Sequence, residues 1–196
     1  MKSKILGLLA VGLLASPAAM AITYNYVGPD FLITENSTDI EGEYTTSMHV
    51  TASVTLASQL EPNFSGYVTP LAFSLSDGRQ TITDAIANPT LSVFGFSTDD
   101  KGVIYEWIAA AGYTDGGLLR QIVTSVIAIG YDSAFICIPN SSGDCDLTWF
   151  QDVPKTYDGA LSLKQGAGWT VPEPGTLALL GLGLAGLGFT RRRKAA

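Results

Sequence analysis

Few residues in this sequence have side chains suited to acid–base, nucleophilic or metal chemistry. The 196 residues include one histidine, His49, and two cysteines, Cys137 and Cys145. A Ser-His-Asp site would have to use His49, but the chain has no Gly-x-Ser-x-Gly elbow to supply the serine. We expect His49 to be a solvated histidine on the polar face of a strand. With one histidine and two cysteines that we expect to be paired, the usual zinc ligand sets cannot be assembled.

Carboxylates are the remaining chemical candidates. Two acids for glycoside hydrolysis can come from distant positions, and neighbouring acids can offer oxygens to calcium. No segment matches the Asp-x-Asp-x-Asp-Gly loop, and aspartate is common in turns, so a plain acidic turn is the default interpretation. We therefore expect no catalytic residue, no cofactor and no metal. The acids considered are Asp77, Asp99, Asp100, Glu106, Asp144 and Asp146.

Aromatic side chains are a further lead, because a face of exposed rings can stack on sugar rings. Aromatic residues are also common in the cores of β-proteins, and the sequence leaves both interpretations open. The residues in question are Tyr24, Tyr26, Tyr105, Trp107, Tyr113, Trp149 and Trp169.

The carboxyl end has three parts in a fixed order. It begins with a proline-containing segment, which the two prolines keep extended, as a protease cleft usually requires: Val171, Pro172, Glu173, Pro174 and Gly175. Residues 176–190 are uncharged and would form a helix about 22 Å long, which is a short span for a hydrocarbon core of about 30 Å. A basic cluster follows, which the positive-inside rule leaves in the cytoplasm: Arg191, Arg192, Arg193 and Lys194. A permanent membrane anchor is the alternative interpretation.

These three parts resemble the PEP-CTERM sorting signal of Gram-negative bacteria, over about residues 171–194. The resemblance implies that exosortase, a multi-pass membrane cysteine transpeptidase, processes the chain within or after residues 171–175. It also implies an exported protein, anchored transiently in the inner membrane and then placed at the cell surface or in an exopolysaccharide-containing matrix. A weaker resemblance to a pattern that recurs among PEP-CTERM proteins covers residues 44–83 and implies no activity.

The amino end indicates export as well. Lys2 and Lys4 precede an apolar run over residues 5–14, and Pro17 interrupts it. Ala19 and Ala21 fit the small-x-small rule, so we expect signal peptidase to cut after Ala21. We therefore predict a signal peptide over 1–21, an acidic β-rich domain over 22–158, a linker over 159–170 and the sorting signal over 171–196.

The predicted mature body is strongly acidic. Six of the 11 basic residues lie in the two terminal segments, whereas only one of the 18 acids, Glu173, does so. Residues 22–171 therefore have five basic and 17 acidic side chains, a net charge of about −12, which repels nucleic acid. In an exported domain the even pair Cys137 and Cys145 predicts a disulfide, closed around a turn-forming loop; a metal or redox pair lacks the spacing.

Hydrophobic alternation with a period of two runs through most of the body. It predicts strands over 48–60, 71–75, 81–83, 91–96, 103–108, 122–129, 134–138, 146–150 and 161–163. The dense β-branched run 122–129 is expected to be a central strand, and 106–112 has a helical turn as an alternative. The fold class predicted is mainly β, an antiparallel sandwich-like domain, with a signal-peptide helix before it and a single membrane-spanning helix after it. A carbohydrate-binding module, or less readily a hydrolase, is the functional alternative to a non-enzymatic surface protein.

Overall fold

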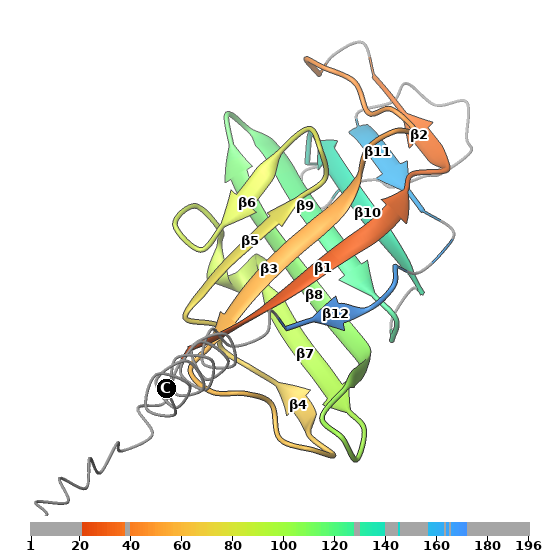
Figure 1. The fold of residues 1–196 in the computed structure, drawn as a ribbon. Coiled ribbons are helices and arrows are strands. Elements are labelled where there is room, and N and C mark those ends of the chain that lie inside the picture. Colours follow the sequence, from red (N-terminus) through yellow and green to blue (C-terminus); the bar gives the residue numbers. More distant parts are fainter. Residues whose placement is uncertain are drawn as a thin grey trace, which may run out of the picture.

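The computed structural model describes residues 21–37, 40–127, 130–139, 145, 157–162, 164 and 166–171. Over these residues the chain forms two antiparallel β-sheets (Figure 1). One sheet has five strands, in the spatial order β12 (Trp169–Thr170), β1 (Ile22–Asp30), β3 (His49–Leu56), β5 (Ala72–Ser76) and β6 (Thr81–Thr83). The other has seven, in the order β2 (Ile33–Glu35), β11 (Tyr157–Leu161), β10 (Tyr131–Cys137), β9 (Leu118–Ser125), β8 (Ile104–Asp115), β7 (Val93–Thr98) and β4 (Ser65–Tyr67).

The two sheets share one apolar core. Along β3 every second residue, from Val50 to Leu56, is buried, and the residues between them are partly exposed. Because successive side chains of a strand point to opposite faces, this alternation gives β3 one face for the core. Rings from both sheets meet there: the Tyr26 ring of β1 lies 5.6 Å from the Trp107 ring of β8. The prediction of a mainly antiparallel β-fold is confirmed.

Most predicted strands are present, with shifted ends. The prediction for 81–83 matches β6, and β9 is the middle strand of the seven-stranded sheet, as expected for 122–129. Strand β8 runs through residues 106–112, of which 106–110 pair with β7 and 108–112 pair with β9, so the helical turn considered there is wrong. A short 3-10 helix, Pro89–Leu91, precedes β7. The strand expected over 146–150 lies outside the described residues.

The stretch 159–170 differs from the expected linker. Its first residues belong to β11, which pairs with β10 and β2, and its last two form β12, which pairs with β1. Glycine and polar residues in this stretch are typical of exposed tethers, but the Trp169 side chain is 8% exposed and belongs to the core. The folded domain therefore extends to Thr170, beyond the predicted boundary at 158.

The predicted export segments fall almost wholly outside the described residues. This applies to residues 1–20, to the apolar run 176–190 and to the basic cluster 191–194. Within the described ranges, no helix is long and apolar enough to cross a membrane.

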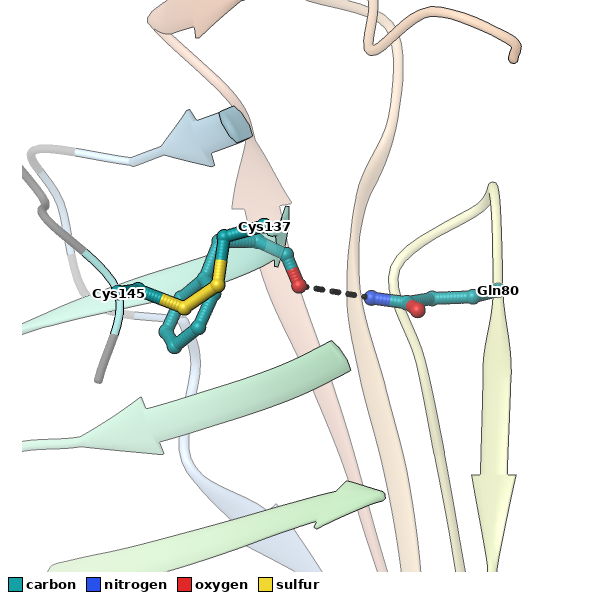
Figure 2. Close-up of a disulfide and its surroundings, with 4 residues drawn as sticks. Gln80, Cys137 and Cys145 are labelled. Atoms are coloured by element: carbon teal, nitrogen blue, oxygen red, sulfur yellow. Dashed lines mark hydrogen bonds between the residues drawn. A yellow bond between two sulfur atoms is a disulfide. The ribbon is translucent and has the colours of Figure 1, made fainter. Parts of the chain in front are cut away.

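The predicted disulfide is present. Cys137, at the end of β10, is bonded to Cys145, and their Cα atoms are 5.9 Å apart (Figure 2). Phe135, Cys137 and Tyr157 form a small cluster of buried residues apart from the main core. Gln80, from the turn between β5 and β6, reaches the same region and its Nε2 donates to the carbonyl oxygen of Phe135 over 3.4 Å (Figure 2). The disulfide thus fixes the end of β10 near a contact between the two sheets.

Reduction of the Cys137–Cys145 bond is expected to lower the free energy of unfolding by about 2–3 kcal/mol, because it frees a short loop in the unfolded chain. Urea unfolding with and without dithiothreitol measures this change. The matched control is the double variant Cys137→Ala/Cys145→Ala, whose stability should not respond to the reductant. An equal response of the control to dithiothreitol would contradict the attribution of the stability change to this disulfide.

Candidate functional site

Strand β12 brings the described chain to the start of the predicted sorting segment. Thr170 pairs with Asn25 and Trp169 with Tyr26, at the edge of the five-stranded sheet (Figure 1). Val171 follows, outside the strand and 38% exposed. The other residues of the segment, from Pro172 to Gly175, lie outside the described residues, as does Ala19 of the predicted signal-peptidase site; Ala21 is exposed. The domain therefore ends immediately before the residues that sequence analysis assigns to sorting.

Trp169 holds this short strand in place. Its ring lies 5.5 Å from the Tyr26 ring and 5.3 Å from the Phe96 ring, the latter pair edge to face. Its indole nitrogen is buried and has no hydrogen-bond partner in the described part of the chain. The Trp169 side chain therefore stabilises the strand by packing rather than by hydrogen bonding.

A groove of about 350 Å³ opens where the five-stranded and seven-stranded sheets meet near β4. Its apolar wall includes Tyr67, Pro70, Phe73 and Phe94, and its polar groups include the Asp84 carboxylate. Tyr67 is 77% exposed. It lies against Gly95, where a Cβ atom would approach the ring to 3.1 Å. A groove lined by an exposed ring and an aspartate is suited to a small amphipathic ligand such as a sugar. Sequence analysis did not single out Tyr67, because only its neighbours in space distinguish it.

The aromatic platform considered from the sequence is not formed by most of its candidates. Four of the seven are buried in the main core: Tyr24, Tyr26, Trp107 and Trp169. They face inward because each sits at a core position of its strand, where burial of a large ring is favourable. Tyr105 is 55% exposed, Tyr113 is partly buried below Arg120, and Trp149 lies outside the described residues.

The candidate acids are used in turns and in the core. Asp99 Oδ1 accepts the backbone N–H groups of Val103 and Lys101, at 2.8 and 2.9 Å, and these hydrogen bonds lower its pKa. Asp100 is exposed, Glu106 is partly exposed on β8, and Asp144 and Asp146 lie outside the described residues. Among the residues that are described, no three His, Cys, Asp or Glu side chains come close enough to hold a metal ion.

His49 lies at the surface, as expected. Its side chain is 36% exposed, and its Nδ1 is 3.2 Å from Asp30 Oδ1. Both residues sit at the end of the β1–β3 ladder, where they pair across the two strands.

Asp77, which sequence analysis placed in a turn, belongs to a buried polar cluster. Its Oδ1 accepts the backbone N–H groups of Arg79 and Gln80, and its Oδ2 accepts the Tyr44 hydroxyl at 2.8 Å. Arg79 Nη1 lies 2.7 Å from Asp158 Oδ2 of β11, and its guanidinium stacks 4.8 Å from the centre of the Tyr44 ring. This cluster joins the β5–β6 turn to the other sheet.

Asp132 of β10 forms a second buried polar contact. Its side chain is 1% exposed, and both carboxylate oxygens accept the Tyr26 hydroxyl, at 2.9 and 2.8 Å. Burial raises the Asp132 pKa to about 6, although its hydrogen bonds and the nearby His49 oppose the rise. The Tyr26 hydroxyl also accepts the backbone N–H of Gly166 at 3.1 Å, which connects Asp132 to the segment before β12.

The architecture and its carboxyl end define the class of protein: an antiparallel two-sheet domain that ends at a terminal sorting segment. Residues 170–194 match the family described as the PEP-CTERM protein-sorting motif. The chain therefore carries a PEP-CTERM sorting motif over residues 170–194, as the sequence resemblance implied. This motif is the recognition signal of exosortase, so the protein is marked for export and for processing at the membrane. No curated protein and no solved structure matches the chain.

Proposed function

We propose that this chain is a non-enzymatic protein of the cell surface or extracellular matrix of a Gram-negative bacterium, cleaved by exosortase within or after residues 171–175. The observation that supports it most is the sorting motif, matched over 170–194 and beginning at the last residue of β12. Signal peptidase would remove residues 1–21, and the inner membrane would hold the precursor until cleavage. Exopolysaccharide is the matrix partner proposed.

The body of the domain supports a structural role. The candidate acids Asp77 and Asp99 accept several hydrogen bonds from their own turns, and this use of both carboxylates differs from a pair facing each other across a cleft. The acidic composition favours solubility in a crowded matrix.

Processing is tested by expressing the full chain in a bacterium with exosortase and in the same strain lacking it. In the first strain, intact mass of the released protein should show loss of the basic end at 191–194; in the second, the full-length precursor should stay in the membrane fraction. The triple variant Pro172→Ala/Glu173→Ala/Pro174→Ala should accumulate as precursor in both strains. The control Pro62→Ala removes an exposed proline more than 100 residues before the motif in the sequence and should be processed normally. Equal release with and without exosortase would contradict the proposal.

A sugar-binding role is the second candidate function, and the groove beside Tyr67 favours it. Its wall combines an exposed ring, prolines and the Asp84 carboxylate, the kinds of groups that hold the apolar face and the hydroxyls of a sugar.

Tyr67→Ala is expected to weaken any oligosaccharide binding at least about tenfold, which corresponds to about 1.4 kcal/mol. A glycan array identifies the oligosaccharide, and titration calorimetry with that oligosaccharide measures the dissociation constant. The matched control is Tyr105→Ala, which removes another exposed tyrosine, one that does not line the groove. Unchanged affinity in Tyr67→Ala, or an equal loss in Tyr105→Ala, would show that the groove is not the site.

A further inference from the structure

The carboxyl-terminal strand connects the folded domain to its sorting motif without any intervening tether. Trp169 and Thr170 are hydrogen-bonded to β1, and the match to the sorting motif begins at residue 170. A protease that binds its substrate in an extended conformation needs a stretch of chain that is not hydrogen-bonded to another strand. The described structure therefore limits how much of the chain on the amino side of the motif a protease can bind.

Strand β12 ends at Thr170, opposite Asn25, although β1 begins at Ile22 and offers further residues for pairing. Because β12 is antiparallel to β1, a longer β12 would place Val171 opposite Tyr24 and Pro172 opposite Thr23. Proline has no backbone N–H and cannot donate to the ladder. Pro172 is therefore suited to end the pairing and to separate the motif from the sheet.

We propose that β12 positions the sorting motif for cleavage: Trp169 keeps the chain up to Thr170 in the fold, and exosortase cuts at or after Val171 while β12 stays paired. This inference rests on the proposed function, because it requires processing by exosortase. The cut breaks one peptide C–N bond. The acyl carbon passes to water or to an acceptor amine, and the freed amine, with the proton from that nucleophile, stays on the carboxyl-terminal fragment. Trp169 is a positioning residue and does not touch the reacting atoms.

The packing around β12 shows which changes would loosen it. The Trp169 ring contacts the Tyr26 and Phe96 rings, so Trp169→Ala removes the anchor. Gly166 lies so close to β1 that a Cβ atom would be 2.5 Å from the Val27 carbonyl oxygen. Gly166→Ala therefore pushes the segment before β12 away from β1 without removing a core side chain. Trp169→Phe keeps a ring and loses no hydrogen bond, because the indole nitrogen has no partner within the described ranges.

The first experiment uses the full chain, co-expressed with exosortase, and reads the carboxyl terminus of the released product by intact mass. Wild type and Trp169→Phe are expected to end at Val171 or later. Trp169→Ala and Gly166→Ala are expected to give additional products that end between residues 164 and 170. Ile82→Ala, a fully buried position on β6 at the opposite edge of the same sheet, controls for general destabilisation and should give the wild-type ends.

The second experiment locks β12 to β1. Asn25 and Thr170 are directly opposite, and such pairs have Cα atoms about 4.5–5.5 Å apart, within the range of a disulfide. The variant Asn25→Cys/Thr170→Cys should be processed at the same rate whether the new disulfide is formed or reduced. Thr170→Cys alone is the control for the change within the matched motif.

Three results would overturn the role of β12 while leaving exosortase processing intact. They are a wild-type product that ends before Val171, wild-type ends in both loosened variants, and a locked form that is not cleaved. Absence of any exosortase product from wild type would overturn the proposed function, and the role of β12 with it.

Discussion

Replacement of Arg79 by methionine is expected to lower the free energy of unfolding by about 3–5 kcal/mol, because it leaves a buried carboxylate without its cation. Arg79 Nη1 lies 2.7 Å from Asp158 Oδ2, and the two side chains are 9% and 0% exposed. The change also removes the guanidinium from the Tyr44 ring and from the carbonyl oxygen of Glu41. Chemical unfolding of the full chain in detergent measures the loss.

Two further variants separate the ion pair from a general effect of charge removal. Lys101→Met removes a cation from an exposed turn and should change stability by less than about 0.5 kcal/mol. Arg79→Met/Asp158→Asn removes both charges of the ion pair and should recover much of the stability lost in the single variant, because the buried Asp158 carboxylate is then no longer left without its cation. A double variant as unstable as Arg79→Met alone would argue that packing, rather than charge, makes Arg79 important.

Asp132→Asn is expected to remove about 3 kcal/mol of pH dependence from the unfolding free energy between about pH 4 and pH 7. Burial raises the Asp132 pKa from 3.8 to about 6 in the folded protein. Between these two values the unfolded chain has released a proton that the folded protein retains. Stability contributed by this carboxyl is therefore highest below about pH 4, falls as pH rises through about 6, and is constant above about pH 7.

The measurement is a series of urea unfolding curves across this pH range for wild type and Asp132→Asn. Because other acids titrate in both proteins, the difference between the two curves isolates Asp132. The control Asp115→Asn changes an exposed acid and should keep the wild-type slope. Parallel curves for wild type and Asp132→Asn would show that the buried carboxyl does not titrate in this range.

Local patterns in the sequence were sufficient for many of the strands. The alternation around Val50, Ala52 and Val54 identifies β3, because a half-buried strand must place apolar residues at every second position. The pair Cys137 and Cys145 was also predictable, since so short a loop of turn-forming residues brings two exported cysteines together. The sorting motif is a linear signal, read along the chain, so its identification needed no fold.

Such local patterns could not predict contacts between residues that are far apart in the chain. Trp169 lies in a glycine-containing stretch typical of a tether, and only the Tyr26 and Phe96 rings, contributed by other strands, bring it into the core. Sequence analysis placed Asp77 in a turn and did not single out Asp132, yet Tyr44 and Tyr26 donate to these two carboxylates from distant positions. Tyr67 is distinguished only by the groove that two sheets form beside it.

The sequence alone thus determined the strand-rich character, the disulfide and the sorting address, because each depends on residue type, spacing and order. Only the tertiary structure decided which rings are buried, which carboxylates are paired and how far the domain extends before the sorting motif. Those properties depend on which strands become neighbours, and the pairing of β1 with β12 joins residues more than 140 positions apart.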